Sequence, residues 1–101
     1  MRKDFRAYNL AVEFYRSTKT LFLPSHLKEQ LNRASSSIAL NLAEGSARYT
    51  QADKRKFYNI AFSSLRECQA IIELADCDNT KINSLADFLA ANIYKLIQVT
   101  T

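Results

Sequence analysis

Residues 51–76, QADKRKFYNIAFSSLRECQAIIELAD, decide the fold class of this chain. Apolar or small side chains recur through the stretch in steps of four and three residues, at Phe57, Ala61, Ser64, Cys68, Ile71 and Ala75. That spacing lines up side chains along one face of an α-helix. A second stripe lies beside the first and consists of Tyr58, Phe62, Leu65 and Ile72. The stretch therefore predicts one long helix.

The same periodicity predicts three more helices, over residues 4–20, 26–44 and 81–99. The 101 residues include one glycine and one proline, so the turn residues that β-hairpins need are missing. A hydrophobic content of 48% is enough to build a core. Because short connections place sequential helices side by side and antiparallel, we expect one all-α domain over residues 1–101. Its predicted fold is an antiparallel up-down-up-down four-helix bundle.

Five residues have the chemistry of helix ends. Ser25 and Thr80 are expected to be N-caps, and Thr50 is expected to cap the third helix, with Asp53 in the capping-box position. Gly45, the only glycine, is expected to end the second helix with a positive φ, which is a conformation that favours glycine.

The predicted helices over residues 4–20 and 51–76 each carry two apolar stripes, which is more than one small bundle needs to cover. An uncovered apolar face commonly becomes a subunit interface, so the sequence predicts a homo-oligomer. A monomer with thicker internal packing is the alternative. Polar residues also interrupt the apolar seams, among them Asn41 and Asn92. We interpret them as packing and register residues, with a polar site as the alternative.

The net charge of +4 is unevenly distributed along the chain. Residues 1–66 hold twelve basic and five acidic residues, whereas residues 67–101 hold two basic and five acidic ones. The up-down topology brings the start of the first helix, the junction of the second and third, and the end of the fourth to one end of the bundle. The residues expected to bind nucleic acid there are Arg2, Lys3, Arg6, Arg48, Tyr49, Lys54, Arg55 and Lys56.

Two features favour an anionic partner, RNA or DNA, at this basic end. Basic side chains in the first turns of the third helix oppose the helix dipole, which a surface without an anionic partner would avoid. Tyr49 and Tyr58 lie among the charges and could stack on bases. The alternative is an ordinary solvated polar face.

We predict no enzymatic activity, no cofactor and no metal. His26 is the only histidine, no glycine-rich loop is present, and the carboxylates are scattered. Cys68 and Cys77 form no CxxC pair and are expected to be free thiols in a reducing compartment. No apolar run reaches the ~20 residues that span a membrane. The charged start of the chain does not fit a signal peptide, so a cytoplasmic protein is expected.

Three stretches carry a resemblance to a known family. They are residues 38–45 (IALNLAEG) followed by Arg48, residues 56–67 (KFYNIAFSSLRE) and residues 4–11 (DFRAYNLA). Over nearly its whole length the chain resembles the 23S ribosomal RNA intervening-sequence proteins, which are small bacterial four-helix bundles. That family shares its fold with the accessory variability determinants of diversity-generating retroelements. By position, Asn41, Glu44, Gly45 and Arg48 carry over as family-motif residues, while Ala39 replaces a proline that often precedes the motif.

The resemblance implies homo-oligomers, typically pentameric barrels, with no known catalysis. It also implies, from the retroelement relatives, a reverse transcriptase and nucleic acid bound through a basic surface. The leading hypothesis is a homo-oligomeric, pentameric adaptor that binds structured RNA or DNA through its basic end, as an accessory to an RNA- or reverse-transcriptase-linked system. The alternative is a protein–protein scaffold module that docks an acidic protein and binds no nucleic acid.

Overall fold

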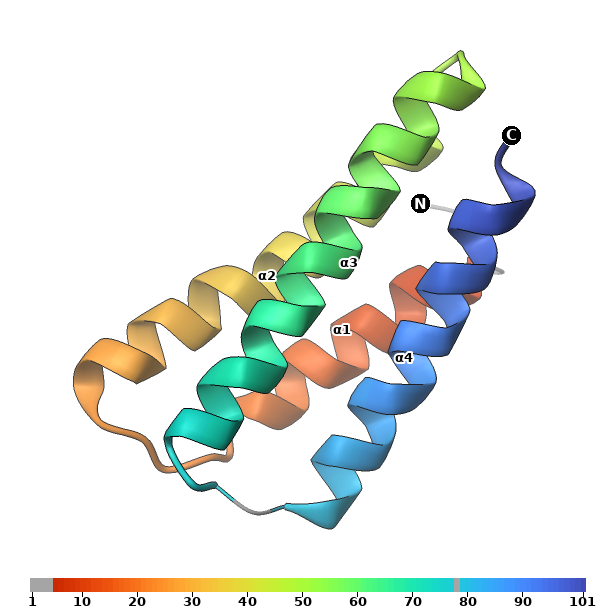
Figure 1. The fold of residues 1–101 in the computed structure, drawn as a ribbon. Coiled ribbons are helices and arrows are strands. Elements are labelled where there is room, and N and C mark those ends of the chain that lie inside the picture. Colours follow the sequence, from red (N-terminus) through yellow and green to blue (C-terminus); the bar gives the residue numbers. More distant parts are fainter. Residues whose placement is uncertain (1–4, 78) are drawn as a thin grey trace.

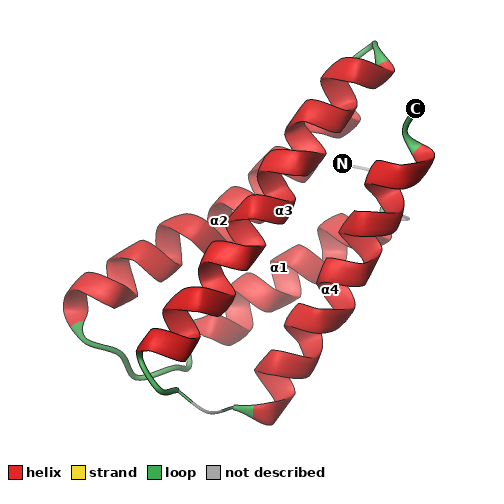
Figure 2. Ribbon diagram, in the orientation of Figure 1, coloured by secondary structure: helices red, strands yellow, loops and turns green. Residues whose placement is uncertain are grey.

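The computed structural model describes residues 5–77 and 79–101, and all regular secondary structure within them is helical (Figure 2). The helices are α1 (Arg6–Thr18), α2 (Ser25–Ser46), α3 (Gln51–Leu74) and α4 (Thr80–Val99). Each helix packs against its neighbours in sequence, and α4 closes the bundle against α1 (Figure 1). The predicted all-α, up-down-up-down four-helix bundle is confirmed.

The predicted helix boundaries differ from the observed ones by two residues or fewer wherever both are described. The predicted start of the first helix, at residue 4, lies outside the described residues. After α1 the chain turns toward α2, and one side chain of α2 donates to two carbonyl groups of this connection. The ammonium of Lys28 donates to the carbonyl oxygens of Lys19, at 3.1 Å, and Leu21, at 2.9 Å. Carbonyls at a helix end need such donors because they lack partners within the helix.

One of the three predicted N-caps is confirmed. The amide of Asp53 donates to the hydroxyl of Thr50 at 3.1 Å. Ser25 and Thr80 are wrong, because each is the first residue of its helix and not the residue before it. Asn79 caps α4 through its side-chain oxygen, which accepts from the amide of Ile82 at 2.9 Å. Asn is among the strongest N-cap residues, and here it stands one position before the threonine.

The prediction for Gly45 is wrong, because this residue lies inside α2 and has no positive φ. A left-handed helix end does occur, but at Asp76 after α3, where φ is 54°. The amide of Asp76 donates to the Glu73 carbonyl at 3.1 Å, and the amide of Cys77 donates to the Ile72 carbonyl at 3.2 Å. This pair of bonds is the Schellman arrangement, which stops a helix by turning its last carbonyls inward.

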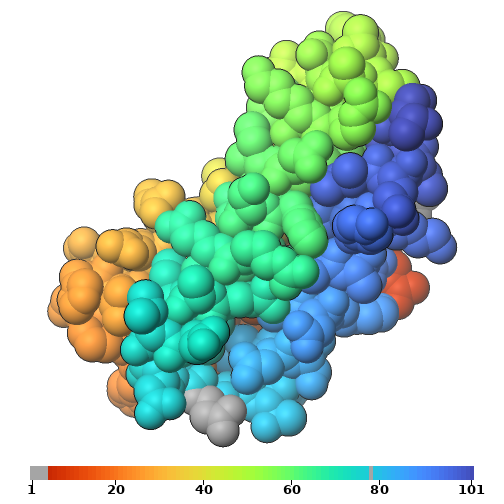
Figure 3. Space-filling model, viewed as in Figure 1, coloured from red at the N-terminus to blue at the C-terminus, as the bar shows by residue number. Residues whose placement is uncertain are grey.

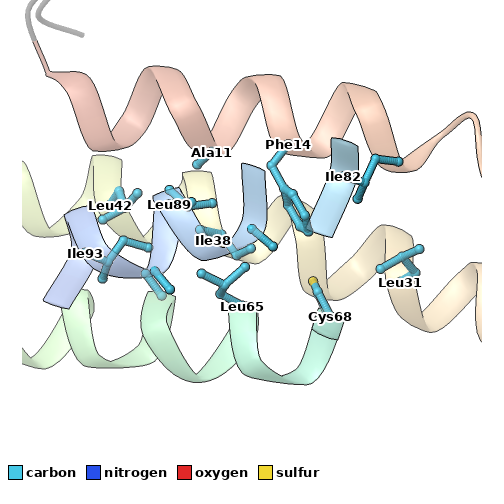
Figure 4. Packing of buried hydrophobic residues seen from close by; sticks show 14 of the residues in the cluster. Ala11, Phe14, Leu31, Ile38, Leu42, Leu65, Cys68, Ile82, Leu89 and Ile93 are labelled. Carbon is cyan, nitrogen blue, oxygen red and sulfur yellow. The ribbon is translucent and has the colours of Figure 1, made fainter. Parts of the chain in front are cut away.

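One cluster of buried side chains joins the four helices (Figure 4). Its labelled members are Ala11 and Phe14 from α1, Leu31, Ile38 and Leu42 from α2, Leu65 and Cys68 from α3, and Ile82, Leu89 and Ile93 from α4. Because all four helices contribute, the core fixes the relative positions of both bundle ends.

Both apolar stripes predicted for the first helix contact the core, and Ala7, Phe14 and Leu21 are buried. Tyr8 and Leu10 are partly buried against the core. The large apolar side chains that are exposed on the described helices lie on α2, α3 and α4, and they are Leu40, Ile60, Leu74, Phe88, Tyr94 and Val99.

Candidate nucleic-acid interface

The turn between α2 and α3 projects beyond the rest of the bundle. These two helices have 22 and 24 residues, whereas α1 has 13 and α4 has 20. Their shared end reaches past the start of α1 and the end of α4 (Figure 1), and it stands out in the space-filling view (Figure 3). We call residues 44–57 the tip. They hold four cationic and two acidic side chains, which gives a net charge of +2.

Small side chains let α2 and α3 approach closely toward the tip. The hydroxyls of Ser37 and Ser64 lie 3.0 Å apart across the two helices. At Gly45, an added Cβ would lie 2.6 Å from Cε1 of Tyr58 and 3.1 Å from Cβ of Phe57. The glycine therefore makes room for a buried ring, and this close approach explains a family-motif residue that the sequence assigned to a helix cap.

The three other family-motif residues, Asn41, Glu44 and Arg48, also have structural contacts. The side-chain amide of Asn41 donates to the Ser37 carbonyl at 2.8 Å and to the Ser37 hydroxyl at 3.0 Å. The amide of Asn92 likewise donates to the carbonyl four residues before it, that of Phe88, at 2.8 Å. Both amides are therefore held against the backbone of their own helices. Glu44 pairs with Arg48 over 2.8 Å.

The Phe57 ring organises two cations at the tip. The guanidinium carbon of Arg48 lies 4.7 Å from the ring centroid, and the ammonium of Lys56 lies 5.9 Å from it. Nη2 of Arg48 lies 2.8 Å from Oε2 of Glu44, the Arg48 side chain is 42% exposed, and a guanidinium has five N–H donors. Arg48 is thus held in place while keeping donors for a phosphate. Sequence reasoning missed Phe57 as a platform because Arg48 meets it across the turn.

Lys54 and Arg55 contact other parts of the chain. The Lys54 ammonium donates to the Ser46 carbonyl at 3.2 Å, within the tip. Nη1 of Arg55 donates to the Thr100 carbonyl at 2.9 Å, across 45 positions of sequence. Arg55 is half-buried and ties α3 to the end of α4. Of the three consecutive cations, Lys56 is the exposed one, and Arg55 has a clear structural role.

Arg6 belongs to a different surface from the tip. Its guanidinium carbon lies 4.9 Å from the Phe88 ring centroid, on the face between α1 and α4. A groove of about 250 Å³ on that face is lined by Arg6, Lys95, Val99 and neighbouring apolar side chains. The predicted residues Arg2 and Lys3 lie outside the described residues. The structure therefore brings Arg48, Lys54 and Lys56 together at the tip and leaves Arg6 apart from them.

The two tyrosines that were expected to stack on bases differ completely in exposure. Tyr58 is 4% exposed and packs edge-on against Phe5, with ring centroids 6.4 Å apart. Tyr49 is 100% exposed in the turn of the tip. Only Tyr49 can present a ring face to a partner.

A second aromatic and cationic surface, between α3 and α4, escaped the sequence reasoning. The guanidinium of Arg66 lies 4.8 Å from the Phe62 ring centroid, and the Phe62 and Tyr94 centroids are 6.3 Å apart. The spacing of four between Phe62 and Arg66 was the available signal. Nearer the α3–α4 turn, the same side of the bundle becomes acidic. A hollow of about 460 Å³ there is lined in part by Glu73, Asp76 and Asp87.

The side chains that commonly bind metal ions do not gather in the described residues. Among residues 5–77 and 79–101, no group of three or more His, Cys, Asp or Glu side chains is placed to hold a metal ion. His26 is exposed in the first turn of α2. Burial, and after it the negative charge of Glu67, raises the pKa of the Cys68 thiol to about 12, so this thiol stays protonated at neutral pH. No described helix is both long and apolar enough to cross a bilayer.

The chain matches the model of a known protein family. A family model described as 23S rRNA-intervening sequence protein matches residues 5–100. The matched range contains the four helices and the whole tip, and it confirms the resemblance carried by residues 38–45 and 56–67. A comparison with curated proteins finds no match.

Proposed function

The chain belongs to the 23S rRNA-intervening sequence protein family, and from this membership and the geometry of the tip we propose that it is a non-enzymatic, self-associating adaptor that binds structured RNA or DNA. The binding surface is the tip, with Arg48, Lys54 and Lys56 contacting phosphates. The compartment we propose is the cytoplasm, where the two cysteines, which are free thiols in the structure, would remain reduced.

The observation that supports this proposal most strongly is the grouping of cations on a projecting end. Arg48 and Lys56 share the Phe57 ring, and Lys54 is anchored on the α2 side of the turn. Their side chains are partly ordered before any partner arrives, which lowers the entropy lost on binding. Because the tip projects past the end of α4, its outer part is open to a bulky polyanion (Figure 3).

The helix dipole provides a second argument. Lys54 and Lys56 lie in the first turns of α3, and Asp53 is the acidic residue of its first turn. An exposed cation in the first turn of a helix costs on the order of 0.3–1 kcal/mol and a cation in the second turn costs less, and a bound phosphate would offset this cost. An anionic partner therefore accounts for a charge placement that the isolated chain does not favour.

The salt dependence of RNA binding tests the proposal. Affinity for a hairpin RNA is measured by fluorescence anisotropy from low to physiological salt, for the wild type and for Lys54→Glu/Lys56→Glu. Arg55 is left in place because it holds the end of α4. Loss of two phosphate contacts should reduce the slope of log affinity against log salt by about two and weaken binding at least tenfold at low salt.

The control is Lys19→Glu/Lys81→Glu, which changes the net charge by the same amount at the opposite end of the bundle. This variant should bind RNA nearly as well as the wild type, with an unchanged salt slope. Absence of wild-type binding at low salt would overturn the proposal. Equal weakening by the two double variants would show that net charge matters and that the tip does not.

The second candidate function is a protein-only scaffold, and the exposed apolar side chains favour it. Leu40 is 67% exposed on α2 and Val99 is 66% exposed on α4. Such side chains suit assembly into a homo-oligomer, for which we propose the pentamer implied by the family. The tip would then dock an acidic protein, such as a reverse transcriptase. Affinity capture with and without nuclease separates the two functions, because a partner retained after nuclease treatment favours the scaffold.

A further inference from the structure

The side chain of Tyr49 takes no part in packing the bundle. The residue stands in the turn at the outermost part of the tip, and it is 100% exposed. Tyr58, on α3, is a tyrosine that contributes to stability, and its ring is buried against Gly45 and Phe5. A fully exposed ring on a convex end contributes little to the core, so a contact with a binding partner is the role that remains for it.

The groups around Tyr49 specify the chemistry of that partner. Arg48 precedes it directly, with its guanidinium held on the Phe57 ring, and Lys54 and Lys56 follow in the first turns of α3. A flat aromatic face among phosphate-binding cations matches a nucleotide, which offers a base to stack and a phosphate to pair. An acidic peptide would satisfy the cations but would leave the ring without a flat counterpart.

The convex shape of the tip favours unpaired bases over paired ones. In a continuous duplex each base is already stacked on both sides, and opening a step costs a few kcal/mol. A loop, bulge or single strand presents a base whose face is free for an aromatic side chain. A lone ring projecting from a tip can reach such a base without deforming a duplex.

We infer that Tyr49 is a stacking platform for an unpaired base, and that the nucleic-acid substrate of this protein is a loop, bulge or single-stranded segment flanked by phosphates that the tip cations bind. The inference rests on the proposed nucleic-acid function and names its substrate class. In this arrangement the cations supply most of the affinity, and Tyr49 supplies the preference for unpaired over paired bases.

The test measures the affinity of the full chain for two RNAs of equal length and charge, one with an unpaired internal loop containing 2-aminopurine and one fully paired. The wild type should prefer the loop RNA roughly tenfold and quench the 2-aminopurine fluorescence. Tyr49→Ala should lose the preference and the quenching while keeping its affinity for the paired RNA. Tyr49→Phe should keep both, because the ring and not the hydroxyl stacks. The same loop made of DNA shows whether the 2′-hydroxyl contributes.

Phe22→Ala is the matched control, because Phe22 is 96% exposed in the turn between α1 and α2 at the opposite end. This variant should behave as the wild type. The salt slope provides an independent readout, since Tyr49→Ala should shift the line without changing its slope, whereas Lys54→Glu/Lys56→Glu should change the slope.

The outcomes separate failure of the inference from failure of the proposed function. Equal wild-type affinity for both RNAs, or a preference that survives in Tyr49→Ala, overturns the stacking role and leaves nucleic-acid binding in place. Absence of binding to either RNA at low salt overturns both. A change in oligomer size in Tyr49→Ala, measured by light scattering, would identify the ring as an assembly contact and would also overturn the inference.

Discussion

A single methyl group at position 45 would lie inside the van der Waals envelope of a buried ring. The added carbon would stand 2.6 Å from Cε1 and 2.9 Å from Cδ1 of Tyr58, and that ring is also in edge contact with Phe5. Alanine favours a helix interior over glycine by about 1 kcal/mol. Overpacking a core costs about 1–3 kcal/mol, so we expect the clash to prevail and Gly45→Ala to lower the free energy of unfolding by about 1 kcal/mol.

Urea denaturation followed by circular dichroism measures that change, and a double-mutant cycle identifies its cause. In a Tyr58→Ala background the two closest contacts are gone and only Cβ of Phe57, at 3.1 Å, remains near the added carbon, so Gly45→Ala should lose most of its destabilising effect or become stabilising. If Gly45→Ala stabilises the chain with Tyr58 present, the close approach of α2 and α3 is looser than these distances indicate.

Among the elements, α3 is followed by the residue with the unfavourable backbone conformation, Asp76. Asp76 has a φ of 54°, and a left-handed conformation costs a residue with a side chain roughly 1 kcal/mol or more relative to glycine. Its carboxylate also stands at the negative end of the helix dipole. Both contributions have the same sign, so Asp76→Gly should raise the free energy of unfolding by about 1 kcal/mol.

The matched control for Asp76→Gly is Ala75→Gly, one residue earlier, where the backbone has a right-handed helical conformation with φ of −79°. Glycine should destabilise there by up to about 1 kcal/mol, because it gains no conformational relief and loses chain entropy on folding. Urea denaturation of both variants decides the matter. Equal destabilisation by the two substitutions would contradict the role assigned to Asp76.

Helices and their order follow from local pattern, whereas the tip contacts depend on groups that are distant in the sequence. The steps of three and four through residues 51–76 predict α3 because each step reports the same buried face. Glycine chemistry alone could not show that Gly45 faces a tyrosine ring on the next helix. Likewise, the topology predicts that Arg55 lies at the basic end, but its bond to the Thr100 carbonyl depends on how the last turn of α4 meets α3.

At the scale of the whole molecule, four of the exposed apolar side chains lie on two opposite faces. Leu40 and Ile60 lie two turns along their helices from Arg33 and Glu67, whose ion pair marks the outer face between α2 and α3. Phe88 and Val99 lie on the face between α4 and α1. In a bundle closed by contacts between α4 and α1, these two faces point in opposite directions. Contact of one face with the other face of the next copy is heterologous, and such contacts close into rings when the rotation permits.

This arrangement predicts a specific complementation between two variants. Leu40→Glu and Val99→Glu should each convert the proposed ring into monomers, because each places a charge in one of the two faces. Mixed together they should form a heterodimer and no larger species, since each variant keeps the face that the other has lost.

Leu74→Glu, at an exposed apolar position near the end of α3, is the control and should leave the proposed ring intact. Light scattering of each protein and of the mixture measures these masses. A dimer formed by either variant alone would show that the faces pair with themselves, and a monomeric wild type at micromolar concentration would remove the case for a ring.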